Sequence, residues 1–283
     1  MRSSKSLILV GVLMFGALAL MLSGCSGDDD PPTIDTQDQD PLELTLVSPM
    51  VTANVDSTIG VVLTGLRAAT LSEIEIEDGL DDILFGPTPP DSSTTVSDYW
   101  HVSYLTETQA GSSGSIQIMV DSIQFRGDGS PNISAMHSDA MTYVHHNSVT
   151  ASDTTVSYND KNVDANVTFS GIDEDATSVN GSFSYYSHEK EVSDLVNTRE
   201  TWDVDGTITS LTFSKSSGGW QTGCPSSGTV QLSVAYSLQQ GDATPVTNAW
   251  EITLTFENGS FTAAVTYNQL SDSYDEHVCD LAS

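Results

Sequence analysis

The sequence is poor in basic residues and in cysteine. Its 283 residues include eight lysines and arginines against 39 acidic residues, a formal net charge of −31. So acidic a chain is repelled by the phosphates of nucleic acids and by anionic lipid headgroups, which argues against both as partners. It suits a salty exterior, where self-repulsion is screened within about 10 Å. The three cysteines are too few for a zinc site with four cysteine ligands.

The common catalytic motifs are also missing. The sequence contains no G-x-S-x-G elbow, no phosphate-binding Walker loop and no dinucleotide fingerprint. His188-Glu189 begins the zinc-protease motif, but Val192 stands where the second histidine is needed. This pattern favours a non-enzymatic protein. An active site assembled from distant residues leaves no motif, so an enzyme stays an open alternative.

The N-terminus has the layout of an export signal. Arg2 and Lys5 precede an uninterrupted apolar run from Leu7 to Leu22, and Leu22-Ser23-Gly24-Cys25 follows at its end. The run is at the short end of what a membrane-spanning helix needs, so a transmembrane anchor is the second interpretation.

The LSGC stretch at 22–25 resembles the lipobox of bacterial lipoprotein signal peptides. The resemblance implies cleavage before Cys25, lipidation of its thiol with palmitate-like chains, and anchoring in a membrane at about 0.8 kcal/mol per buried methylene. Ser26, in place of aspartate, implies sorting to the outer membrane, on its periplasmic or its cell-surface face. Asp28–Asp30 look like an acidic surface-export tag, and a solvated tether is the alternative. The other interpretation of Cys25 is an ordinary residue beside a secretory signal.

These features divide the chain into a signal peptide at 1–24, a lipidated cysteine with a disordered acidic linker at 25–41, and a single β-rich domain at 42–283. Removal of the signal leaves six basic residues against 39 acidic ones, a formal charge of −33.

Cys224 and Cys279 are then expected to form a disulfide, since the compartment is oxidising. The chain-entropy model of disulfide stabilisation predicts that this bond adds about 4 kcal/mol to the stability of the fold. Two free thiols or a metal pair are the alternative. The stretch around Cys224, GCPSSG, resembles segments of uncharacterised bacterial envelope lipoproteins and implies no activity.

The strongest structural signal is a hairpin at Trp250–Tyr267. Asn258-Gly259 is a typical type I′ turn between alternating strands. It pairs Phe256 with Phe261. Six further residues share their apolar face: Trp250, Ile252, Leu254, Ala263, Val265 and Tyr267. A second NGSF, Asn180–Phe183, predicts another turn.

Period-two alternation predicts further strands at 99–105, 115–125, 141–145, 163–169, 182–186, 201–213 and 229–236. Helical spacing predicts one N-terminal helix within 49–69, packed on the sheet. The expected fold is mainly β: an antiparallel β-sandwich, or a curved half-barrel with that helix on the sheet.

Several residues are candidates for binding. Adjacent histidines, His145 and His146, point to opposite faces of a strand, so they are interpreted as surface or strand-end residues and not as a metal site. Calcium prefers oxygen ligands, so two pairs of aspartates are candidate calcium ligands: Asp173 with Asp175, and Asp203 with Asp205. The alternative is that these aspartates lie in solvated turns. Trp100 and Trp220 are free to stack on a sugar ring, whereas core packing is expected for the other tryptophans.

The function expected from these features is that of a lipid-anchored envelope protein with a structural or binding role. One alternative is a carrier for an apolar ligand or lipid, enclosed between the sheet and the helix. A second is a calcium-assisted glycan-binding module. Nucleic acid is not an expected partner; the membrane is one, through the lipid anchor.

Overall fold

The computed structural model describes residues 60–69, 83–85, 88, 90–109, 114–133, 135–153, 157–192, 197–216, 219–220, 225–267 and 270–276. All of them belong to one compact unit, Thr36–Ser283. The signal peptide, the linker, Cys25, Cys224 and Cys279 lie outside these ranges. Lipidation and the disulfide therefore stay predictions. Within the described ranges, no helix has the length and apolar character needed to cross a membrane.

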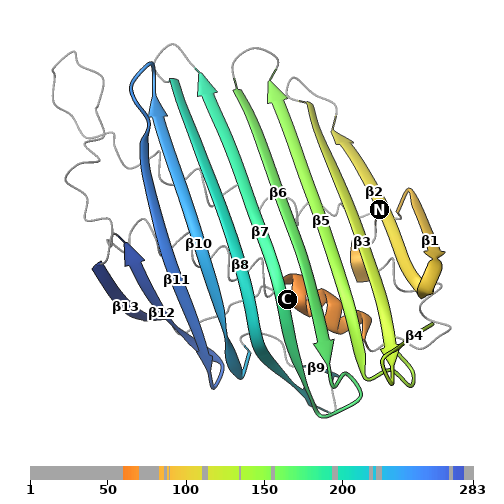
Figure 1. The fold of residues 1–283 in the computed structure, drawn as a ribbon. Helices are drawn as coiled ribbons and strands as arrows, with labels where there is room; N and C mark the ends of the chain where they lie inside the picture. Colours follow the sequence, from red (N-terminus) through yellow and green to blue (C-terminus); the bar gives the residue numbers. More distant parts are fainter. Residues whose placement is uncertain are drawn as a thin grey trace, which may run out of the picture. The chain divides into compact units, whose positions relative to one another are not determined.

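The described chain is dominated by long antiparallel strands, arranged in the order β1-β2-β3-β5-β6-β7-β8-β10-β11-β12-β13, with β4 beside β3 and β9 beside β8 (Figure 1). A short 3-10 turn, η1 (Ser97–Tyr99), separates the first two strands. The strands are β1 (Ser92–Val96), β2 (Trp100–Gln109), β3 (Gly114–Gly127), β4 (Ser130–Asn132), β5 (Ala140–Asp153), β6 (Ser157–Ser170), β7 (Ala176–Val192), β8 (Asn197–Ser216), β9 (Gly219–Trp220), β10 (Ser227–Gln240), β11 (Val246–Glu257), β12 (Ser260–Tyr267) and β13 (Leu270–Glu276).

This arrangement confirms the mainly antiparallel β fold. Of the two architectures left open, the sandwich is wrong for the described residues, because their main strands form one open sheet and not two packed ones. Each strand pairs with a neighbour close in sequence, so the sheet is a meander with short connections. All seven predicted strand ranges lie within observed strands, apart from Tyr99, which belongs to η1.

The β11–β12 hairpin follows the predicted register. Phe256 lies opposite Phe261, and the pairing continues through Leu254 with Ala263. Asn258 and Gly259 both have positive φ, 54° and 81°, as a type I′ turn requires. The predicted apolar partners face the core, since Trp250 and Phe261 are each 2 % exposed.

The turn predicted at Asn180–Phe183 is wrong, because this segment lies inside β7. A β-bulge between Val179 and Gly181 interrupts the pairing with β8 there. A Cβ atom at Gly181 would collide with the carbonyl oxygen of Asn166 on β6. The glycine is therefore needed for close strand approach and not for a turn.

One face of the sheet carries most of the core and is called the inner face. Its central row crosses the strands through Ile123, Tyr143, Val167, Ile208 and Leu254, which are all buried. Alternate residues point to the opposite side, called the outer face. The outer face is polar over most of its width, as the alternation in the hairpin predicts.

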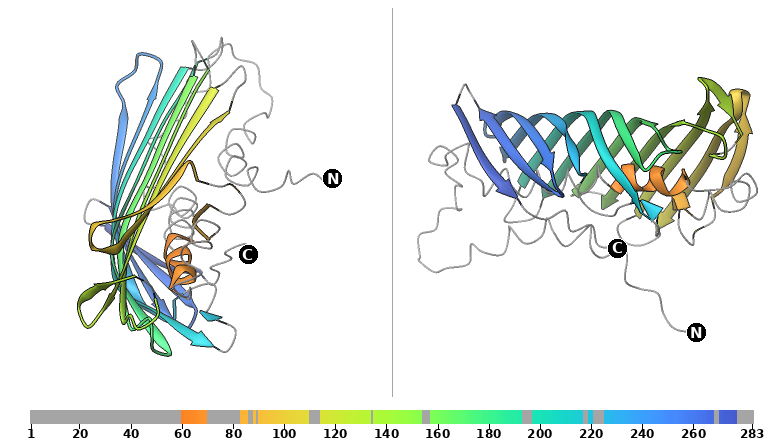
Figure 2. Two further views of the ribbon diagram at one scale, coloured as in Figure 1. Left: turned by 90° about the vertical axis from the view of Figure 1, so that its right-hand side faces the viewer. Right: turned by 90° about the horizontal axis from the view of Figure 1, so that it is seen from below.

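A helix at 60–68 lies on the inner side of the sheet (Figure 2). Val62 and Leu66 are fully buried and belong to the same cluster as Tyr143 and Phe169. Gly65 faces the sheet so closely that a Cβ there would lie 2.7 Å from Cζ of Phe169. The earlier part of the predicted helix, 49–59, lies outside the described residues, so the helix as predicted over its full range stays a prediction.

Candidate functional site

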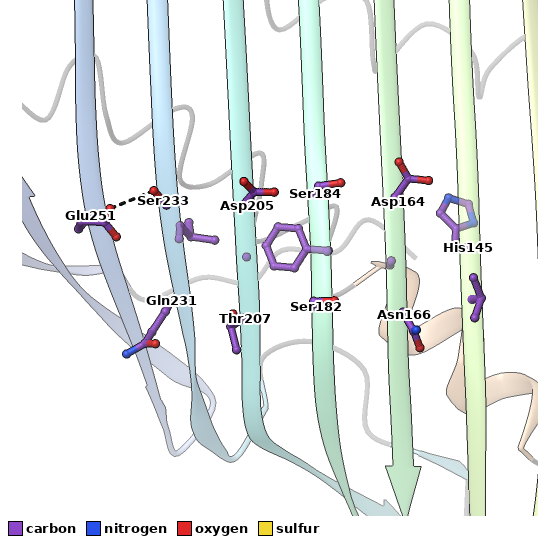
Figure 3. Close-up of a pocket in the computed structure, with 15 residues that line it drawn as sticks. His145, Asp164, Asn166, Ser182, Ser184, Asp205, Thr207, Gln231, Ser233 and Glu251 are labelled. Carbon is purple, nitrogen blue, oxygen red and sulfur yellow. Dashed lines mark hydrogen bonds between the residues drawn. The ribbon is translucent and has the colours of Figure 1, made fainter.

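A shallow groove of about 580 Å³ crosses the outer face. It spans six neighbouring strands, β5 to β11, and two rows of polar side chains line it from β6 onward (Figure 3). With strands about 4.8 Å apart, five steps give a length of about 24 Å. The polar side chains that line it come from five strands, β6 to β11: Asp164, Asn166, Ser182, Ser184, Asp205, Thr207, Gln231, Ser233 and Glu251. At the β5 end the groove is lined by Val144 and His145, and the side chain of His145 points to the opposite, inner face.

The strand register explains why these residues meet. Asp164 lies opposite Ser184, Ser184 opposite Asp205, and Asp205 opposite Ser233. The second row likewise joins Asn166, Ser182, Thr207 and Gln231. The hollow follows from side-chain length, because short serines on β7 and β10 lie between longer amides and carboxylates.

The groove offers hydrogen-bonding groups of several kinds. Hydroxyls and amides both donate and accept, while carboxylates only accept. Ser233 Oγ donates to Glu251 Oε1 at 2.9 Å. Asp164 accepts from Nδ2 of Asn162 at 2.7 Å and contacts Nδ1 of His146 at 2.5 Å, which fixes its orientation. Among the described residues that line the groove, none is lysine or arginine.

The two adjacent histidines behave differently. They point to opposite faces, as predicted: His146 contacts Asp164 on the outer face, and His145 contacts the inner-face residue Asp121. The interpretation of His145 as a surface or strand-end residue is wrong, because it lies in the middle of β5 with its Nδ1 2.8 Å from Oδ1 of Asp121. That carboxylate is 1 % exposed and also accepts the hydroxyl of Tyr143 at 2.6 Å.

The Tyr143 hydroxyl is held in its protonated form. Burial raises the pKa of the phenol, and the charge of Asp121 and the hydrogen bond to it raise that pKa further. The phenol is therefore a donor at every physiological pH. The cluster of Asp121, Tyr143 and His145 satisfies a buried carboxylate with two donors, which is a structural role.

A second polar cluster lies on the inner face near the other ends of the strands. Trp202 Nε1 donates to Glu200 Oε1 at 2.9 Å, and the Trp202 ring lies 4.3 Å from that of Tyr236. Burial raises the pKa of the Glu200 carboxyl; the hydrogen bond from Trp202 opposes this, and the charge of Glu189 adds to it. Glu189 is in turn paired with Lys161 at 3.0 Å. Sequence reasoning missed this cluster, because its members come from four strands.

The four candidate calcium ligands are not brought together. Asp173 and Asp175 lie in the turn before β7, where Lys215 N donates to the Asp175 carbonyl at 2.7 Å. Asp203 and Asp205 lie on the outer face of β8, about 33–40 Å along the strand from Lys215. Asp205 lines the groove. Within the described part of the chain, no group of three potential metal ligands is found. Calcium stays a prediction.

The two tryptophans proposed for ligand binding do not line the groove. Trp100 is half-buried at the start of β2 on the outer face. Trp220 packs against the core cluster, and Nζ of Lys215 lies 5.0 Å from its ring centroid. The groove itself was not predicted from the sequence.

Comparison with known proteins adds no further identification: no family model, no curated protein and no solved structure matches this chain.

Proposed function

We propose that the chain is a lipid-anchored protein of a bacterial outer membrane, and that its β domain binds a neutral glycan in the outer-face groove without catalysing a reaction. The observation that carries the binding role is the groove: two rows of hydroxyl, amide and carboxylate side chains from five strands, with no lysine or arginine among the described lining residues. The anchor follows from the lipobox resemblance at Cys25.

Sugar hydroxyls complement this lining. Each hydroxyl donates to a carboxylate or amide oxygen and accepts from an amide or hydroxyl. Acidic side chains such as Asp205 and Glu251 repel anionic polymers, which leaves uncharged ones. A groove about 24 Å long suits several consecutive sugar units better than a single one. A linear glycan lying across the strands therefore fits both the chemistry and the length.

Titration calorimetry of the full chain with neutral oligosaccharides of one to six units tests this proposal. Affinity is expected to rise with length. Asn166→Ala and Gln231→Ala each remove hydrogen bonds worth about 1 kcal/mol, so each weakens binding by about fivefold. Thr255→Ala, on the outer face of β11 but outside the groove lining, is the matched control and leaves affinity unchanged. Binding unaffected by both groove variants refutes the location, and turnover of a bound oligosaccharide refutes the non-enzymatic role.

The calcium contribution is tested separately. If Asp203 or Asp205 holds calcium during binding, EDTA lowers both the glycan affinity and the melting temperature, and added calcium restores them. If EDTA has no effect, glycan binding is independent of calcium.

A second candidate is a carrier for an apolar ligand. It is favoured by one observation: large apolar side chains line the inner face from β3 to β12, and the described helix at 60–68 covers that same side. Solvent extraction of the purified chain followed by mass spectrometry tests it. A carrier yields a stoichiometric lipid, and an empty extract refutes this role.

A further inference from the structure

Exposed apolar side chains are concentrated at one end of the sheet. Of the eight large hydrophobic side chains that are exposed among the described residues, seven lie between 96 and 136: Val96, Tyr99, Tyr104, Ile116, Ile118, Ile133 and Met136. This region comprises β1 to β4 at one edge of the sheet (Figure 1). Grouped exposed apolar residues mark interaction surfaces, whereas scattered ones need no explanation. We call these seven residues the apolar end.

The register places part of this group on the outer face. In β3, Ile116 and Ile118 are 49 % and 43 % exposed. The neighbouring residue Tyr104 on β2 is opposite Val120 and is 43 % exposed. Further along β3 the apolar residues change face, since Ile123 and Phe125 are fully buried on the inner side. No bulge interrupts the β3 register, so the outward isoleucines are a property of the sequence and not of a local irregularity.

The corner at η1 adds a second observation. Tyr99 is 49 % exposed and has φ of 56°, a left-handed conformation that is uncommon for a bulky residue and costs about 1–3 kcal/mol. Asp98 beside it has φ of 58°, and the buried amide of Gln124 donates to its carbonyl at 2.9 Å. The backbone thus holds an aromatic ring outward in a strained conformation.

The charged residues around the apolar end limit which partners can bind there. Between residues 90 and 139, Arg126 is the one lysine or arginine in the sequence, whereas Asp91, Asp98 and Asp128 are exposed there. An anionic membrane is therefore repelled. A second copy of the chain, with its own net charge of −31, is repelled as well. An uncharged lipid surface carries no such penalty, and tyrosines are favoured at its boundary with water because they are apolar at one end and polar at the other.

We propose that the apolar end rests on an uncharged lipid surface, and that the groove runs away from that surface along the glycan of a membrane glycolipid. The second part rests on the proposed glycan function and the lipid anchor. One cross-strand row carries the argument: Tyr104 lies opposite Val120, Val120 opposite His146, and His146 opposite Asp164. Three strand spacings, about 14 Å, separate Tyr104 of the apolar end from Asp164, the first polar side chain of the groove. With the edge strands on the lipid, the groove leads outward at the depth of a glycolipid headgroup.

The lipid contact is tested with the full chain in phosphatidylcholine vesicles. A polarity-sensitive fluorophore is attached at Ile118→Cys, and at Thr255→Cys on the outer face of β11 as the matched control. The unsubstituted chain, treated with the same fluorophore, measures the label that attaches to the native cysteines, and this signal is subtracted. Brominated lipid is expected to quench the probe at 118 at least twofold more than the probe at 255. Equal quenching, or failure of the chain to co-sediment with the vesicles, overturns the proposal.

Combined with the oligosaccharide titration, this experiment distinguishes failure of the lipid contact from failure of the glycan function. If the probe at 118 is quenched but no oligosaccharide binds, the lipid contact stands and the glycan function fails. If oligosaccharides bind but the probe at 118 is not quenched, the glycan function stands and the lipid contact fails. Vesicles containing a neutral digalactosyl lipid should bind the chain more tightly than plain ones, and Gln231→Ala should reduce this gain in affinity, by up to about fivefold. A concentration-dependent dimer, lost in Ile118→Ser, identifies a second copy as the occupant and overturns the proposal.

Discussion

Replacing Gly65 by alanine tests whether the helix at 60–68 packs on the sheet as described. Glycine inside a helix is normally unfavourable, and alanine should stabilise it by about 0.5–1 kcal/mol. At Gly65 the new Cβ would lie 2.7 Å and 3.0 Å from Cζ and Cε2 of Phe169, and 3.1 Å from Cδ1 of Tyr143. Overpacking of this kind costs about 1–3 kcal/mol. Because Phe169 and Tyr143 are buried, their rings have little room to move. We therefore expect Gly65→Ala to lower the free energy of unfolding by about 1 kcal/mol.

Gly60 provides the matched control. It is the first described residue of the same helix, and no atom lies within 4 Å of an added Cβ. Gly60→Ala is therefore expected to leave stability unchanged or to raise it by up to about 1 kcal/mol. The two variants make the same chemical change and should have opposite signs.

Urea unfolding followed by tryptophan fluorescence measures both variants. Phe169→Leu removes the ring tip that collides with the new Cβ, so the Gly65→Ala, Phe169→Leu double variant should be more stable than the sum of the single changes predicts, by about 0.5–1 kcal/mol. If Gly65→Ala stabilises the chain as much as Gly60→Ala, the contact between the helix and Phe169 is refuted.

Three further changes probe other parts of the structure by the same assay. Tyr143→Phe removes one of the donors to the buried Asp121 and should cost about 1–3 kcal/mol; a cost below about 0.5 kcal/mol contradicts the hydrogen bond. Burial raises the pKa of the Glu200 carboxyl above its ordinary value of 4.5. Compared with the unfolded chain, the native state therefore favours the protonated carboxyl, and the free energy of unfolding falls as the pH rises above about 4.5. Glu200→Gln should therefore be more stable than the unchanged chain at pH 7 and equal to it below about pH 4, and a constant difference at all pH values refutes the assignment. Gly259→Ala introduces a side chain at φ of 81° with no atom nearby, so it should cost about 1 kcal/mol from backbone conformation alone, and an unchanged urea midpoint contradicts the I′ turn.

The strands could be predicted wherever one side of the alternation is apolar. In β11 and β12, every second residue is large and apolar, and the Asn258-Gly259 turn fixes the register. The true lengths of β7 and β8 could not be predicted, because their ends are polar on both faces, as in SHEKEV and NTRET. Those ends are held by pairing with neighbouring strands over their whole length, a non-local cause that leaves no periodic signal.

The groove left even less signal in the sequence. Each strand contributes one or two small polar residues, which look like an ordinary solvated face when each strand is read alone. Only the register brings Asp164, Ser184 and Asp205 into one row. The bulge at Gly181 shows the same limit, since the backbone of a neighbouring strand and not the NGSF sequence decides its conformation.

The apolar end, in contrast, could have been predicted from the sequence of β3. The alternation of apolar residues along that strand shows which of them share a face. Apart from Met119, the apolar residues occur at 116, 118 and 120 and then at 123 and 125, a change of phase within one strand. In a strand without a bulge, such a change must place one of the two sets on each face. Since Ile123 and Phe125 form the core, Ile116 and Ile118 must point outward, whatever the rest of the fold does. β3 therefore offers a second apolar surface besides the one that faces the core, and this surface is the one that the proposed lipid contact uses.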